Sequence, residues 1–132
     1  MADRYYTLQE AQELVPWLVQ TFQDIEPLRE RARQLSAGVR ELTVRMRGNG
    51  GGQSRRRMEH LQRELAETSS LIYGRVDDVH QRGMVVKGVA PGLVDFPHMR
   101  EGQEVYLCWR EGESQLQFWH DVNAGFASRQ PL

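Results

Sequence analysis

Apolar residues recur every three or four positions through the first eighty residues of the chain, and this period predicts helices. Between residues 11 and 46 they form one stripe with a sevenfold repeat, which is typical of helices that pair along their length. The stripe consists of Ala11, Leu14, Leu18, Phe22, Ile25, Leu28, Ala32, Leu35, Val39, Leu42 and Met46. Pro16 and Pro27 interrupt it, and we expect a kink or a short break near each, because proline lacks a backbone N–H.

A second stripe with the same spacing covers residues 58–79, and a glycine-rich stretch separates the two. We interpret this stretch, residues 48–54, as a flexible turn. Thr7–Glu10 has the spacing of a helix capping box, and Gly83 is placed to end the second helix. Residues 7–83 are therefore predicted to form a long antiparallel helical hairpin. Two helices rarely cover each other's apolar faces fully, so homo-oligomerisation through this coiled-coil-like hairpin is one hypothesis.

The last fifty residues change from a helical period to short strands bounded by turns. Two short strands are expected at 84–86 and 93–96, the second ending at Pro97. Residues 104–110 and 115–121 alternate apolar and polar side chains and predict a β-hairpin around a turn at 111–114. The tail, residues 122–132, is expected to be irregular. The fold class is thus α+β, a helical hairpin packed on a small antiparallel sheet, in a single domain of residues 1–132.

A turn of two or four residues in the β-hairpin gives one and the same register, which assigns each side chain to a face. The apolar face then pairs Trp109 with Leu116, Leu107 with Phe118, and Val105 with His120. The outer face pairs Tyr106 with Trp119, Cys108 with Gln117, and Glu104 with Asp121. A shift by one residue would exchange the faces and break the apolar matching.

Several segments together resemble a bacterial and archaeal family known only as a domain of unknown function, numbered 2203. The matching segments are Tyr5–Ala11, Leu14–Leu18, Gly92–Pro97, Glu104–Trp109, Phe118–Asp121, Ala124–Phe126 and Arg129–Leu132. The family implies no established activity. The resemblance supports the α+β fold and points to the C-terminal third as the functional region. The glycine-rich turn and its arginines lie outside the pattern.

Composition excludes several classes of protein. The chain has 132 residues, with 27% charged side chains. It has no apolar run of the roughly 20 residues that a transmembrane helix needs, and its N-terminus lacks the apolar core of a signal peptide. A single cysteine, Cys108, excludes an internal disulfide. We therefore expect a cytoplasmic protein without a membrane partner.

Glu104 and Asp121 form the most informative predicted pair, because carboxylates directly opposite each other repel unless a cation or a proton lies between them. Four resolutions stay open. The pair can splay into solvent, accept a bridge from Arg100 or Arg129, keep one carboxyl protonated as a general acid, or bind a divalent metal together with His120 or His98. A metal-dependent hydrolase that uses Glu104, His120 and Asp121 is therefore one hypothesis.

A non-enzymatic binding module is our leading interpretation of the sequence. Its contact surface for a protein or small-molecule partner would be the outer face of the β-hairpin and the tail. That surface consists of Glu104, Tyr106, Trp119, Asp121 and Arg129. We expect Arg129 either to hold an anion or to pair with Asp121 or Asp95. We expect Cys108 to be structural, since no base or cation is predicted next to its thiol.

The net charge of −1 conceals a segregation of charge along the chain. Residues 40–63 carry seven arginines against Glu41 and Glu59, a local balance of +5. Such a cluster can be a solvated surface, or it can contact nucleic-acid phosphates through Arg55, Arg56 and Arg57. No aromatic residue lies in this segment, so any contact would be with the backbone and not with stacked bases.

Overall fold

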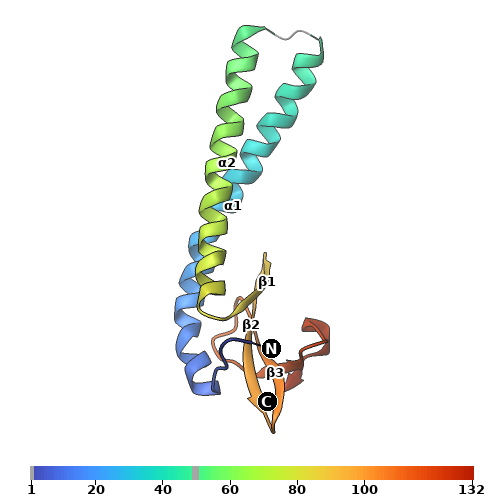
Figure 1. Ribbon diagram of the computed structural model, residues 1–132. Helices are drawn as coiled ribbons and strands as arrows, with labels where there is room; N and C mark the ends of the chain where they lie inside the picture. The colour runs from blue at the N-terminus through green and yellow to red at the C-terminus, as the bar shows by residue number, and fades with distance from the viewer. Residues whose placement is uncertain (1, 49–50) are drawn as a thin grey trace. The chain divides into compact units, whose positions relative to one another are not determined.

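The computed structural model describes residues 2–48 and 51–132 (Figure 1). Two helices, α1 (Leu8–Gly48) and α2 (Gly52–Gln81), precede five strands. The strands are β1 (Val85–Val89), β2 (Gly92–Arg100), β3 (Gln103–Arg110), β4 (Phe118–Asp121) and β5 (Gln130–Pro131), with a short 3₁₀ helix, η1 (Phe126–Ser128), before β5. The predicted α+β class, with a helical hairpin and an antiparallel sheet, is confirmed.

The chain divides into two compact units, and the division runs through both helices. The sheet unit comprises residues 1–23 and 76–132, and the helical unit comprises residues 24–75. Each unit is described separately, and the expectation of a single domain stays a prediction. No helix in the described ranges combines the length and the apolar character needed to cross a membrane.

Local signals in the sequence fix both ends of the helical segment. The Glu10 N–H donates to Thr7 Oγ1 at 3.0 Å, and the Thr7 N–H donates to Glu10 Oε1 at 2.9 Å, so the predicted capping box is confirmed. Gly83 has a φ of 92° directly after α2, in the left-handed region that glycine adopts without strain. The expected short breaks are wrong, since α1 is continuous through Pro16 and Pro27. Both prolines are exposed, so water can bond to the carbonyl that each leaves free.

The five strands form one antiparallel sheet in the order β1-β2-β3-β4-β5. The expected end of the second strand at Pro97 is wrong, because β2 continues to Arg100. The Pro97 carbonyl accepts the Tyr6 N–H at 2.7 Å, so the ring nitrogen also points to that edge, away from the β3 ladder. The missing donor therefore costs no strand hydrogen bond.

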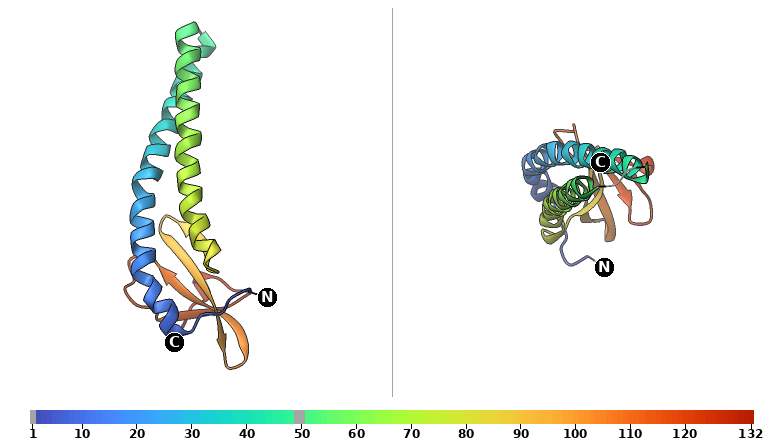
Figure 2. Two further views of the ribbon diagram at one scale, coloured as in Figure 1. Left: turned by 60° about the vertical axis from the view of Figure 1, so that its left-hand side comes forward. Right: turned by 90° about the horizontal axis from the view of Figure 1, so that it is seen from above.

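The first turns of α1 cover one face of this sheet (Figure 2), which we call the helix face. Phe22 lies 5.7 Å from Trp109 between ring centres, and Tyr6 meets Phe96 edge-on at 5.3 Å. Contact is close at Gly92, where an added Cβ would lie 2.7 Å from the Phe22 ring. The helix face consists of Val94, Phe96, Val105, Leu107 and Trp109, all buried. The opposite side, the second face, carries Asp95, Tyr106, Cys108, Phe118 and His120.

In the helical unit the two helices lie side by side (Figure 1) and bury the predicted stripe. Leu35, Leu42 and Leu61 form its core, and Val39, Met46, Met58 and Leu65 pack against them. Arg31 pairs with Glu64 across the two helices. Of the predicted turn 48–54, Gly48 belongs to α1 and residues 52–54 belong to α2, so these positions are helical and not part of a turn. Asn49 and Gly50, where we expected flexibility, lie outside the described residues.

Candidate metal centre

The β-hairpin register differs from the predicted one by a single residue. β3 and β4 pair Val105 with Asp121, Tyr106 with His120, Leu107 with Trp119, and Cys108 with Phe118. The segment between the strands leaves the sheet and bonds to α1 instead. Gln12 donates to the Ser114 carbonyl at 3.0 Å and accepts the Leu116 N–H at 2.8 Å. These two bonds hold residues 114–116 against α1, so the connection between β3 and β4 is longer than predicted. The predicted register of the β-hairpin is therefore wrong.

The shift separates residues that were predicted to share a face. Glu104 is not opposite Asp121, which pairs with Val105 and is exposed. Glu104 and Tyr106 project from the second face, and Trp119 and Asp121 project from the other. The structure therefore does not bring the proposed set Glu104, His120 and Asp121 together. It also divides the predicted contact surface of Glu104, Tyr106, Trp119, Asp121 and Arg129 between two faces.

His120 instead converges with two further side chains, Asp95 and Cys108, on the second face, one from each of three adjacent strands. Asp95 of β2 pairs with Cys108 of β3, and His120 lies on β4 one diagonal step away. One potential ligand atom from each residue lies within 4.8 Å of the other two. They are the one such group of three histidine, cysteine or acidic residues in the described ranges. All three are buried, with exposed fractions of 2%, 2% and 1%.

His120 has two hydrogen-bond partners, which together determine where its protons lie. Its Nδ1 is 2.9 Å from the Asp121 carbonyl, an acceptor only, so Nδ1 carries a hydrogen and donates. Its Nε2 is 3.0 Å from Asp95 Oδ1. A neutral imidazole would point a lone pair at an ionised carboxylate, and such a contact is repulsive. A proton held between the two atoms removes this repulsion, and a metal ion that replaced the proton would do the same.

Cys108 completes the group as a neutral thiol in the absence of metal. Burial raises its pKa to about 12, and the neighbouring Asp95 charge adds to this effect. The Arg129 guanidinium opposes the rise but does not offset it. The expectation that Cys108 is not a reactive thiol agrees with this environment. Its expected neighbour Gln117 is wrong, because Phe118 is opposite.

Arg129 joins the tail to the sheet next to this group. Its guanidinium donates to Glu113 Oε1 at 2.7 Å and to the Cys108 carbonyl at 3.2 Å. It also lies over the rings of Phe118 and Phe126, at 4.1 and 4.6 Å. The expected pairing of Arg129 with Asp121 or Asp95 is therefore wrong, and Glu113 is its partner. The side chain of Arg129 is only 11% exposed, and one guanidinium NH2 group makes these bonds, while its buried Nε has no hydrogen-bond partner in the ranges that the structure describes.

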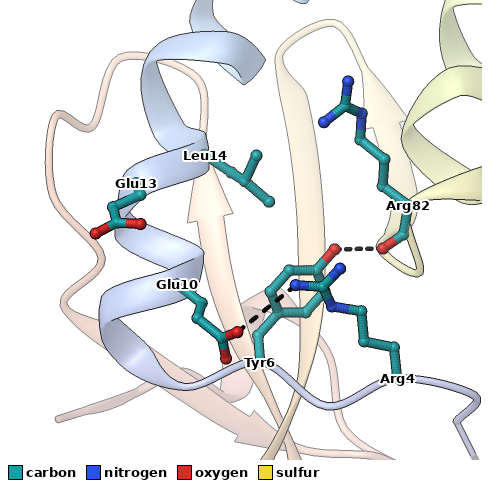
Figure 3. A pocket seen from close by; sticks show the side chains of 6 residues that line it. All are labelled: Arg4, Tyr6, Glu10, Glu13, Leu14 and Arg82. Atoms are coloured by element: carbon teal, nitrogen blue, oxygen red, sulfur yellow. Dashed lines mark hydrogen bonds and ion pairs between the residues drawn. The ribbon is translucent and has the colours of Figure 1, made fainter.

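A separate pocket of about 290 Å³ opens where the N-terminal segment meets the end of α2 (Figure 3). Its lining residues are Arg4, Tyr6, Glu10, Glu13, Leu14 and Arg82. The polar groups here are largely used internally. Tyr6 donates to the Arg82 carbonyl, Arg4 lies 3.7 Å from Glu10, and the Arg82 guanidinium lies 4.1 Å from the centre of the Trp17 ring. Burial raises the pKa of Tyr6, which thus stays a hydroxyl donor.

The sequence drew attention to His120 and Cys108, but it suggested Asp95 only as a partner of Arg129. In the structure Asp95 lies close to both His120 and Cys108. A usable signal was present: Asp95 is the one charged residue within the apolar run Leu93–Phe96. A charge in the middle of a buried strand requires a partner. The predicted phosphate contacts Arg55, Arg56 and Arg57 lie in the helical unit and are exposed.

Comparison with protein families agrees with the resemblance seen in the sequence. The family model described as Uncharacterized conserved protein (DUF2203) matches residues 4–132. No curated protein and no solved structure matches the chain. Asp95, Cys108 and His120 each lie in a segment on which the resemblance was based.

Proposed function

This chain belongs to the uncharacterized conserved family DUF2203, whose description names no activity, and from its own residues we propose that it binds one divalent transition-metal ion. The ligands are Asp95, Cys108 and His120, and the preferred ion is Zn²⁺. The observation that carries the proposal is the convergence of the three buried side chains, each of which offers one ligand atom within 4.8 Å of the other two.

The orientation of His120 supports this role. A histidine that binds a metal usually donates its other ring N–H to a carbonyl or carboxylate, which directs the remaining lone pair at the ion. The bond from Nδ1 to the Asp121 carbonyl has this effect on Nε2. The three ligands lie on neighbouring strands of one sheet, so the backbone holds the donor atoms close together before any ion binds.

Charge balance also favours a divalent ion. Without metal, the thiol is neutral and the Asp95–His120 pair shares one proton, so the buried group carries no net charge. A divalent ion would displace that proton and the thiol proton, leaving one carboxylate, one thiolate and one neutral imidazole around two positive charges. The group is again neutral, so binding does not leave an uncompensated charge in the interior.

The mixture of donors selects among metals. One sulfur, one nitrogen and one oxygen suit Zn²⁺, whose structural and catalytic sites use these ligand types, whereas Mg²⁺ and Ca²⁺ prefer oxygen alone. Three protein ligands leave a fourth position to water or another donor. All three side chains are buried, which favours a bound ion over a substrate site.

The direct test is metal content after purification, removal of metal with a chelator, reloading with Zn²⁺ and desalting. We expect about one zinc per chain in the wild type. Cys108→Ser, Asp95→Asn and His120→Gln should each lower zinc retention by at least about 10-fold, because changing even a residue that only orients a ligand costs about that much. Circular dichroism on each variant establishes that the fold persists.

Matched controls come from the ligand set that the sequence suggested. Glu104→Gln and Asp121→Asn remove a carboxylate close by without touching the proposed ligands, so both variants should retain zinc like the wild type. The proposal is wrong if the reloaded wild type holds well under one zinc per chain. It is equally wrong if Glu104→Gln and Asp121→Asn lose the metal and the three ligand variants keep it.

A further inference from the structure

Arginines in the helical unit fall into two groups that differ in their partners. Along residues 24–39 and at residue 75, each arginine pairs with a carboxylate. These pairs are Arg29–Glu26, Arg31–Glu64, Arg33–Glu30 and Arg75–Asp24. Residues 40–63 are called the arginine tip here, and in its described part only Arg45 has such a partner, Glu41 at 3.5 Å. Within the described ranges, no carboxylate forms an ion pair with Arg40, Arg47, Arg55, Arg56, Arg57 or Arg63.

The arginine tip also contains a surface pocket of about 500 Å³. Its lining residues are Leu42, Arg45, Gln53, Ser54, Arg56, Arg57 and His60, and no carboxylate is among them. Gln53 and Ser54 belong to the first turn of α2, where backbone N–H groups have no partner within the helix. Guanidinium groups and this helix end thus present positive charge to one pocket, which suits an anion with several oxygen atoms.

We propose that the arginine tip binds the phosphate backbone of double-stranded nucleic acid, without regard to base sequence. Repeated phosphates fit better than a single anion, because Arg40, Arg47 and Arg63 lie outside the pocket and also form no ion pair with a carboxylate among the described residues. Guanidinium is suited to phosphate because its planar fork can donate two parallel hydrogen bonds. The tip contains no aromatic side chain to stack on bases, so contact is limited to the backbone.

A membrane surface fits the arginine tip less well. Binding to a bilayer combines basic residues with a buried apolar face on the same helix. In residues 40–63 the only large apolar side chain that is exposed, among those the structure describes, is Val44. Burial of one valine would contribute little, so phosphates in a repeating polymer are the better match.

Fluorescence polarisation of a labelled duplex with the full chain tests this proposal. If about four phosphates are contacted, raising the salt from about 0.05 to 0.2 M should weaken binding roughly 100-fold. Two duplexes of unrelated sequence should bind within about threefold of each other, because backbone contacts carry no base information.

Two triple variants with the same change in charge distinguish binding by the tip from a general effect of net charge. The tip variant is Arg55→Gln, Arg56→Gln and Arg57→Gln, and the control is Arg29→Gln, Arg31→Gln and Arg33→Gln. Three lost phosphate contacts should weaken binding by at least about 30-fold at 0.1 M salt in the tip variant, and by less than about threefold in the control. Helicity measured by circular dichroism should be unchanged in both.

Several results would overturn the proposal. They are an equal loss in both triple variants, undetectable duplex binding at 0.05 M salt, and insensitivity to salt. Vesicles containing phosphatidylserine and free inorganic phosphate are run in parallel. Tighter binding to the vesicles would assign the tip to membranes instead. If millimolar phosphate displaced the labelled duplex as strongly as unlabelled duplex does, the tip would be a site for a single anion. Zinc removal should not alter duplex binding, since no proposed ligand lies in the helical unit.

Discussion

The sheet unit and the helical unit differ in whether their charged side chains have partners of opposite charge. In the sheet unit, the buried charged groups have defined partners: Asp95 faces His120, and Arg129 faces Glu113. In the helical unit, six guanidinium groups of the arginine tip are exposed and form no ion pair with a carboxylate in the part of the chain that the structure describes. Buried charge is costly unless it is compensated, whereas exposed charge is solvated at little cost. The two proposals follow this contrast. In the sheet, a small cation could replace the protons of a buried, compensated group, and at the tip a large anion could pair with exposed guanidinium groups.

The largest effect should come from removing His120, since this leaves Asp95 buried without its partner. In metal-stripped protein, His120→Ala should lower the free energy of unfolding in urea by about 3–5 kcal/mol. His60→Ala, at an exposed histidine beside Glu64 in the helical unit, should change it by less than about 0.5 kcal/mol. Similar losses of unfolding free energy in the two variants would mean that the buried Asp95–His120 pair contributes no more than the exposed Glu64–His60 pair.

Reactivity of the single thiol gives the next largest effect. The high pKa of Cys108, about 12, and its burial should make alkylation of the metal-stripped folded protein at pH 8 at least about 100-fold slower than after unfolding. The same pKa sets a pH dependence. The folded thiol holds its proton more tightly than an unfolded one, so the stability it contributes is complete below pH 9 and is lost as the pH rises towards 12. Rapid alkylation of the folded chain would show that the second face is open.

Close packing provides a contrast between two glycines. Gly92→Ala would place a methyl group against the Phe22 ring and should destabilise the protein by about 2 kcal/mol. Gly74→Ala in α2 meets nothing within 4 Å and should stabilise the helix by about 0.5–1 kcal/mol. Thermal unfolding of both variants measures the difference. Equal effects would indicate that the helix face is loosely packed.

The smallest effect concerns the start of α1. Thr7→Ala removes one half of the capping box and should lower the free energy of unfolding by about 1 kcal/mol. Thr43→Ala serves as the control, because its hydroxyl only bonds back to the Val39 carbonyl within the same helix. Chemical denaturation of both distinguishes a helix cap from an interior threonine, and a larger loss in Thr43→Ala would contradict the assignment.

Much of the fold was predictable because it depends on local patterns. The helical period, the capping box and Gly83 act within a few residues, and each was confirmed. The β-hairpin register was not predictable, since it depends on Gln12 bonding to a segment about a hundred residues away. One residue of shift moved Asp121 off the face of Glu104 and placed His120 on the face that carries Cys108 and Asp95. The candidate site thus depends on a contact between residues far apart in the sequence, and the pattern of apolar positions does not predict such a contact.

The central claim is that Asp95, Cys108 and His120 bind one metal ion, and the single cysteine allows a direct test. Titrating metal-stripped protein with Co²⁺ should produce a thiolate-to-cobalt charge-transfer absorption that saturates at about one ion per chain. Because Cys108 is the only thiol, Cys108→Ser should abolish this band, while Glu104→Gln should leave it intact. Saturating Co²⁺ without any charge-transfer band in the wild type would contradict the account.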